Sequence, residues 1–215
     1  MTFALSCLSL SGLADNTIPE KSFFSFRAGP SVPKGDFASK DANKRAAGFA
    51  NSGFHVAAEY GGFFNRYFGG ALTAGISRNG FDHSAYNSQT RARLYASSGW
   101  RSTYFLGNLL AGLPLGQHFS VYLKGGAGFT LNTYPDVQTN GGGIGSGSTV
   151  NEQKIKSESL AYGFGGGFKW HVNGVGIGLE ANYLGTKPTF SYASTSYKQP
   201  MNALSYNFNL SFKLK

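Results

Sequence analysis

Two short segments place a histidine beside a serine, the residue types that hydrolases use as general base and nucleophile. They are Asp82-His83-Ser84 and His118-Phe119-Ser120. This chemistry needs the serine hydroxyl within hydrogen-bonding reach of the imidazole, and an acid that orients the ring. Neighbours in the chain seldom converge in that way, and His118 has no acidic residue close to it in sequence. We therefore expect no catalytic residues and no enzyme activity.

The sequence offers little for a metal or a cofactor. Cys7 is the single cysteine, so no disulfide within the chain and no cysteine metal cage can form. His55 and His171 stand alone on polar faces and are expected to be hydrogen-bonded rather than metal-ligating. The glycine-rich segment at 140–148 lacks the Gly-Lys-Ser/Thr of a phosphate-binding loop and is expected to be a loop tip. The sequence therefore predicts no metal and no cofactor.

Basic residues outnumber acidic ones, 19 to 10, which gives a net charge of +9 and favours an anionic partner. Nucleic acid is a poor candidate, because no basic stripe with interleaved aromatics lies on one continuous element. The cations gather instead in two regions without strand periodicity. The proposed contact residues are Lys34, Lys40, Lys44, Arg45, Arg78, Arg91 and Arg93, with Arg101 nearby.

The elements that position these residues are strands. Glycine is 31 of 215 residues, aromatics are 15 % and charged residues only 13 %, and no apolar run reaches the ~18 residues of a membrane helix. Apolar and small or polar residues instead alternate with period 2, as in a strand with two different faces. Eight such segments occur, at 23–31, 53–63, 66–77, 100–112, 119–131, 160–171, 175–183 and 204–215.

The connections between these segments alternate strictly between long and short. The long ones span roughly 32–52, 78–99, 132–158 and 185–202, and Asn173-Gly174 is a strong signal for a short hairpin turn. Four long loops therefore share one end and three tight turns the other, an asymmetry typical of outer-membrane barrels. We predict an all-β fold, an eight-stranded antiparallel up-and-down transmembrane β-barrel with the turns and both termini on the periplasmic side.

The choice of a membrane barrel over a soluble one depends on which face is inside. An eight-stranded barrel has room only for side chains, and the long ladders of Phe, Tyr, Leu and Val would overfill it. The apolar face is therefore expected to meet lipid, with aromatic girdles drawn from Trp100, Tyr104, Trp170, Tyr183, Tyr206 and Phe212. The few charges on the other face must then pair, because an isolated buried charge is costly. This predicted lumenal ion network comprises Arg27, Glu59, Lys124, Lys169 and Glu180, either as a structural filling or as a gate.

The segment Glu59–Gly70, with its glycine-rich strand, Phe-Phe-Asn-Arg turn and Phe-Gly strand, resembles a hairpin of Bacteroidetes porin-family β-barrel proteins. The whole pattern resembles the small eight-stranded outer-membrane barrels typified by outer-membrane proteins A and X. The resemblance implies the cell outer membrane of a Gram-negative bacterium, a monomer, and barrel-assembly machinery as a partner during insertion. Residues 1–14 end in Gly12-x-Ala14 and are expected to be a signal peptide, truncated or complete, before a single barrel domain at 15–215.

Three functions fit such a barrel. The first is a structural or interaction protein, whose long extracellular loops contact the phosphates of lipopolysaccharide or an external ligand. The basic loop residues would then be contact groups, although plain solubility of surface loops explains them equally well. The second is a narrow porin-like channel for small solutes, and the third is a lipid A-modifying enzyme.

Overall fold

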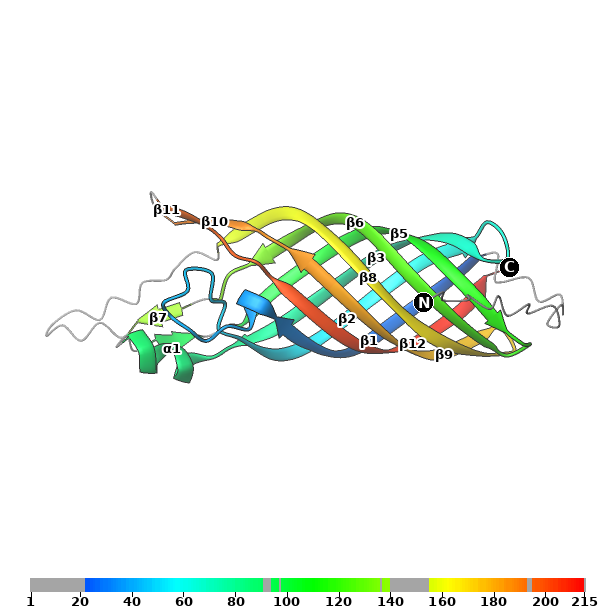
Figure 1. Ribbon diagram of the computed structural model, residues 1–215, viewed down its shortest axis with the longest axis horizontal. Coiled ribbons are helices and arrows are strands. Elements are labelled where there is room, and N and C mark those ends of the chain that lie inside the picture. Colours follow the sequence, from blue (N-terminus) through cyan, green and yellow to red (C-terminus); the bar gives the residue numbers. More distant parts are fainter. Residues whose placement is uncertain are drawn as a thin grey trace, which may run out of the picture.

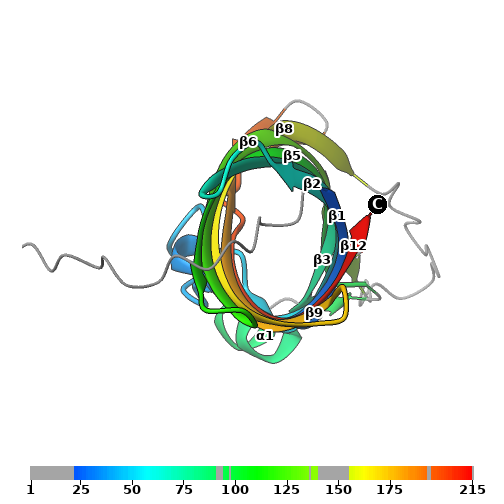
Figure 2. The ribbon, with the colours of Figure 1, turned by 90° about the vertical axis from the view of Figure 1, so that its right-hand side faces the viewer.

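The computed structural model describes residues 22–90, 94–96, 98–135, 137–139, 155–192 and 195–214. Eight long antiparallel strands close into a barrel in the order β1-β12-β9-β8-β6-β5-β3-β2, as Figures 1 and 2 show. This confirms the predicted fold class. The strands are β1 (Ser22–Lys34), β2 (Ala50–Phe63), β3 (Phe68–Phe81), β5 (Trp100–Leu115), β6 (Phe119–Thr133), β8 (Lys156–Val172), β9 (Val175–Thr186) and β12 (Asn202–Leu214). The predicted signal peptide at 1–14, Cys7 and the glycine-rich segment at 140–148 lie outside the described residues.

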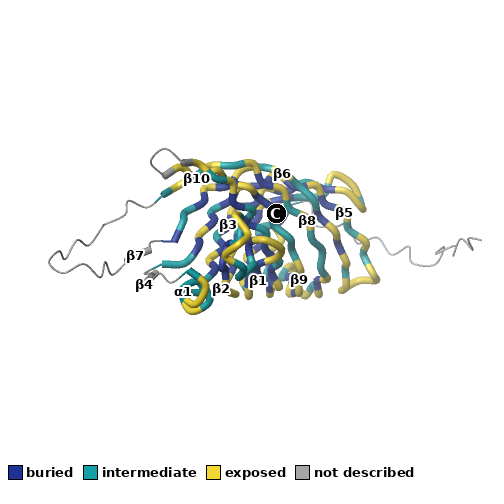
Figure 3. Tube along the Cα trace, turned by 60° about the vertical axis from the view of Figure 1, so that its left-hand side comes forward, coloured by how far each residue is buried: buried dark blue, intermediate teal, exposed yellow. Residues whose placement is uncertain are grey.

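The two faces of the strands have the predicted orientation. Outward side chains are apolar and exposed, such as Phe26 (51 %), Leu72 (69 %) and Leu160 (85 %). Most inward side chains are small or polar, although Phe23, Tyr104 and Leu110 are large exceptions. Figure 3 shows the alternation of buried and exposed residues along the strands. A protein with this surface needs a hydrocarbon environment, because so large an apolar area is not tolerated in water.

The girdle prediction is correct in part. Trp170 and Tyr206 are exposed on the outer surface, whereas Trp100 and Tyr104 are almost completely buried. The reason is parity, because the even-numbered residues of β5 face the interior. The interpretation of Trp100 and Tyr104 as lipid-facing girdle residues is therefore wrong.

Three tight turns join the strands at the end of the barrel where β1 begins and β12 ends (Figure 1). Asn173 (φ 50°) and Gly174 (φ 83°) both adopt positive φ, as the turn between β8 and β9 requires. In the turn between β2 and β3, the Asn65 side chain accepts hydrogen bonds from the backbone N–H groups of Tyr67 and Phe68. Local backbone conformation and side-chain hydrogen bonds thus form the turns at this end, which faces the periplasm in outer-membrane barrels.

The long connections gather at the other end and carry structure that the sequence analysis did not predict. They contain η1 (Gly35–Phe37), α1 (His83–Thr90), a β4 (Leu94–Ala96) and β7 (Val137–Thr139) pair, and a β10 (Thr189–Tyr192) and β11 (Thr195–Lys198) pair. The Asp82 side chain accepts a hydrogen bond from the Ala85 N–H and so caps α1. Within the described part of the chain, no helix is long and apolar enough to cross a membrane. We call the described residues of these connections the head.

Candidate functional site

Four charged side chains meet in the middle of the barrel. Arg27 Nη1 lies 2.9 Å from Glu59 Oε2 and 3.2 Å from Glu180 Oε1, and Lys124 Nζ lies 3.2 Å and 2.7 Å from the same two oxygens. Each cation therefore contacts both carboxylates. All four residues are less than 9 % exposed, so their mutual pairing is what offsets the cost of removing them from water. We call these four residues the ion network.

Neutral side chains complete the hydrogen bonding of the ion network. Thr73 Oγ1 donates to Glu59 Oε2 at 2.8 Å and accepts from Asn108 Nδ2 at 2.9 Å. The Tyr122 hydroxyl and the Asn182 amide both donate to Glu180. Sequence reasoning missed these partners, since polar neutral residues alternate along every strand and only the register brings these particular ones together. The result is a continuous polar layer across the lumen.

Lys169 faces the lumen, as predicted, but it is not one of the four residues of the ion network. Its ammonium is 4.7 Å from the ring centroid of Phe23 and 5.0 Å from that of Tyr122, a cation–π arrangement. Lys169 is only 7 % exposed. Lys169 is opposite Ser120, near the turn between β5 and β6, whereas Lys124 is opposite Gly165. Lys169 therefore lies on the turn side of the ion network.

The histidines and serines form pairs other than those read from the sequence. Ser120 Oγ lies 2.9 Å from Nε2 of His171 on the neighbouring strand β8, rather than pairing with His118, which is close to it in sequence. His55 is held by Asn207 at 2.7 Å and Tyr104 at 2.6 Å. No group of three or more His, Cys, Asp or Glu residues in the described segments could hold a metal ion.

The Asp82-His83-Ser84 segment is used for structure. Besides capping α1, Asp82 forms a 3.1 Å salt bridge with Lys40, which joins the first and second long connections. The Ala85 N–H and the Lys40 ammonium both favour the ionised carboxylate and lower the pKa of Asp82. The His83 ring packs edge-on against Phe81. The Asp82 carboxylate is thus engaged by groups other than His83.

An aromatic cluster closes the loop end of the barrel. Trp100 stands at its centre, with ring centroids 4.8 Å from Tyr134, 5.5 Å from Phe37 and 6.0 Å from Phe190. Its indole N–H donates to the carbonyl of Gly48 at 2.9 Å. We call this cluster the aromatic cap; its buried members are Phe37, Phe49, Ala50, Phe81, Trp100, Phe190 and Met201.

Three basic residues are aligned across neighbouring strands near the loop end of the barrel. Arg78 is directly opposite Arg101 on the neighbouring strand, and Arg101 is opposite Thr133, which is opposite Lys156. All three cations are exposed and point outward, because they share parity with the lipid-facing residues of β3, β5 and β8. We call Arg78, Arg101 and Lys156 the basic row.

The other predicted contact residues are dispersed. Lys34 points outward at the loop end of β1, Lys44 and Arg45 are exposed in the first connection, and Lys40 is engaged with Asp82. Arg91 and Arg93 lie outside the described residues. The basic row therefore contains Arg78 from the predicted set, together with Arg101 and Lys156, whose alignment depends on strand register.

An apolar exterior, a polar interior and a closed ring of strands define an integral membrane β-barrel. A family model described as "Outer membrane protein beta-barrel domain" matches residues 2–215, and the chain belongs to this family. It is an outer-membrane protein.

Solved structures of similar fold include Neisserial surface protein A, at 13 % identity and a TM-score of 0.55, covering 91 % of this chain and 99 % of that one. Ail of Yersinia pestis matches at 14 % identity and a TM-score of 0.45, over 89 % and 97 % of the two chains. Outer membrane protein W of E. coli matches at 15 % identity and a TM-score of 0.43, and the match covers 91 % of this chain and 99 % of that one. No curated protein matches the sequence.

Proposed function

We propose that this protein is a non-enzymatic, non-conducting barrel whose outer surface binds the phosphate groups of lipopolysaccharide. The observation that carries the proposal is the basic row. Like charges directly opposite each other on neighbouring strands destabilise a sheet, and Arg78 and Arg101 are in that position. A phosphate between the two guanidinium groups would convert this repulsion into two charge-assisted contacts.

The basic row lies beside the apolar outer surface of the barrel, where a lipid headgroup would be. Apolar residues follow on the same outward face toward the turn end. Ile76 is two positions from Arg78, Phe105 is four positions from Arg101, and Leu131 is two positions from Thr133. The Arg78 guanidinium lies over the Phe54 ring at 5.8 Å, which orients the side chain at the apolar boundary. Glu158 is an acidic neighbour on this face, two positions from Lys156, so the strongest anion site is expected between the two arginines.

The filled lumen argues against the channel alternative. The ion network spans the middle of the barrel, and the aromatic cap covers the loop end. A solute path would have to break both layers, since the interior of an eight-stranded barrel is narrow enough for side chains to fill it at these two levels. We therefore favour the structural filling over the gate as the role of the lumenal charges.

A second candidate function is binding of an external anion by the head. A surface hollow of about 410 Å³ is lined by Arg45, Lys187 and Lys198, with Asp36 as the acidic residue among its described lining. Tyr197 adds a ring at the same place, and hydroxyl-bearing Thr189 and Ser196 complete a surface suited to an acidic saccharide. This hollow is distinct from the basic row, so variants separate the two.

The experiment compares lipopolysaccharide binding of the folded protein with that of Arg78→Gln/Arg101→Gln. We expect roughly tenfold weaker binding, because two charge-assisted phosphate contacts are lost. The matched control is Lys34→Gln/Lys44→Gln, which also removes two positive charges but leaves the basic row intact. Dephosphorylated lipopolysaccharide should bind both proteins equally. Unchanged affinity in the arginine variant, or an equal loss in the control, would refute the proposal; mass spectrometry of the lipid A tests the enzyme alternative on the same samples.

A further inference from the structure

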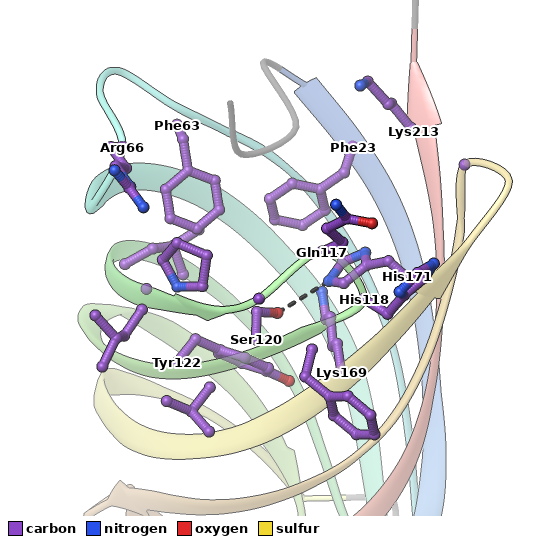
Figure 4. A pocket seen from close by; sticks show the side chains of 18 of the residues that line it. Phe23, Phe63, Arg66, Gln117, His118, Ser120, Tyr122, Lys169, His171 and Lys213 are labelled. Carbon is purple, nitrogen blue, oxygen red and sulfur yellow. Dashed lines mark hydrogen bonds between the residues drawn. The ribbon is translucent and has the colours of Figure 1, made fainter. Parts of the chain in front are cut away.

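The turn end of the barrel contains a cavity that the proposed function does not use. It has a volume of about 300 Å³, and its lining extends from residues of the turns to Glu59 of the ion network. Figure 4 shows it from close by. Glu59 contributes to its inner end, and the turn residues Arg66 and His118 to its mouth. We call it the turn-end chamber. Its size reaches the lower limit for small-molecule sites.

The chamber wall has an apolar side and a polar side. Phe23 and Leu110 pack together with Phe63 partly buried against them, and the two phenylalanine rings are 6.4 Å apart. The polar side presents Lys169 and the hydrogen-bonded pair of Ser120 and His171, drawn with a dashed line in Figure 4. A ligand with one polar and one apolar end matches this separation.

The charges of the chamber favour an anion. Lys169 lies inside it, and Arg66 and Lys213 line it nearer the mouth. Among the described lining residues Glu59 is the acidic one, and both Arg27 and Lys124 already contact its carboxylate. Cations therefore outnumber acids in the described lining of the chamber, and the low surrounding dielectric strengthens their effect on a bound anion.

We propose that the turn-end chamber binds a small amphiphilic carboxylate from the periplasmic side. Its carboxylate accepts hydrogen bonds from the Lys169 ammonium and from the Ser120 hydroxyl, with His171 in the tautomer whose Nε2–H donates to Ser120 Oγ. Its apolar body lies against Phe23, Phe63 and Leu110. Lys169 is well suited to this role, because the rings of Phe23 and Tyr122 hold its ammonium at the boundary between the two sides.

The probe is 2-naphthoate, two fused rings with one carboxylate, and 2-naphthalenemethanol is its neutral counterpart. Binding to the full-length protein in lipid nanodiscs is measured by ligand-detected NMR, with empty nanodiscs subtracted to remove partitioning into lipid. We expect saturable binding of naphthoate that is roughly tenfold tighter than that of the alcohol. This comparison needs no variant. Equal affinity of the two probes, or no saturable naphthoate binding, overturns the proposal.

Variants then locate the site. Lys169→Met keeps most of the side-chain volume over the two rings and should weaken naphthoate binding roughly tenfold while leaving the alcohol unchanged. Lys187→Met, in the head, is the matched control and should change neither. If Lys169→Met fails to fold, the pair Arg66→Gln/Lys213→Gln tests the charge of the mouth, where Arg66 is half-buried and Lys213 is exposed. Several-fold weaker binding is expected. Undiminished naphthoate affinity in the folded variants contradicts the assignment.

Discussion

The two ends of the barrel differ in how far side chains fill the lumen. At the loop end, side chains from four long connections meet around Trp100 and cover the lumen. At the turn end, connections of two to four residues bring too few side chains to do this, and the turn-end chamber remains. The difference shows that connection length determines whether an end of this narrow barrel is filled. The ion network lies between them and separates the two environments.

The largest effect on the free energy of unfolding is expected in the ion network, which lies between the two ends. Glu180→Gln removes a carboxylate that contacts both Arg27 and Lys124 and leaves two cations buried with one acid. We expect a loss of about 3–5 kcal/mol in the free energy of unfolding. Urea unfolding of the protein in vesicles, followed by the gel shift between folded and unfolded forms, measures it.

Glu158→Gln is the matched control for this change. Glu158 is an exposed acid on the lipid-facing side of β8. Its replacement should alter stability by less than about 0.5 kcal/mol. Equal effects of the two variants would show that the ion network adds no more to stability than a surface charge does.

The comparison of the ends also shows what could be predicted from sequence. Alternation with period 2 located all eight strands and put Arg27, Glu59, Lys124 and Glu180 on inward faces, because side-chain parity is local. The aromatic cap could not be predicted, since Phe37 and Phe190 lie in connections without periodicity. Isolated aromatics in long loops are the one signal that could have indicated it.

Register explains most of what else was missed. The alignment of Arg78, Arg101 and Lys156 and the contact of Ser120 with His171 join residues far apart in sequence. A shift of one residue between strands would separate each group. Lys169 was correctly assigned to the inward face, but only the structure shows that rings of Phe23 and Tyr122 surround its ammonium.

The next effect concerns the aromatic cap. Trp100→Ala should cost about 3 kcal/mol, because it leaves a cavity among Phe37, Tyr134 and Phe190 and removes the hydrogen bond to Gly48. The loss should be confined to the head, so limited proteolysis should cut the head sooner while the barrel keeps its gel shift. Loss of the gel shift would show that the barrel does not stay folded when the aromatic cap is weakened, and would contradict this prediction.

A smaller effect is expected at the turn end. Gly174 has φ of +83°, so Gly174→Ala should cost about 1–2 kcal/mol through backbone strain alone. Gly107→Ala is the control, because a Cβ there meets nothing closer than 3.9 Å and the backbone is extended. Urea unfolding should rank the two variants in this order. A larger effect at Gly107 would show that the turn conformation is not what limits this end.

The smallest effect is the pH dependence of the head. The pKa of Asp82 is below its ordinary value of 3.8 because the Ala85 N–H and Lys40 favour the carboxylate. The corresponding stability is present above that ordinary value and is lost as the pH falls through the lower, folded-state pKa. Asp82→Asn should remove this dependence at a cost under about 1 kcal/mol, given the partial exposure of the pair. Proteolysis rates of the head between neutral and acidic pH test this, and a rate independent of pH in the parent protein would contradict it.

The central claim is that a closed lumen makes this barrel a binding surface rather than a pore. Single-channel recording of the folded protein in planar bilayers tests it most directly. We predict no conductance steps from the parent protein or from Trp100→Ala, because the ion network still blocks the lumen when the aromatic cap is weakened. Regular conductance steps from the parent protein, abolished by unfolding it beforehand, would contradict the claim and favour the channel.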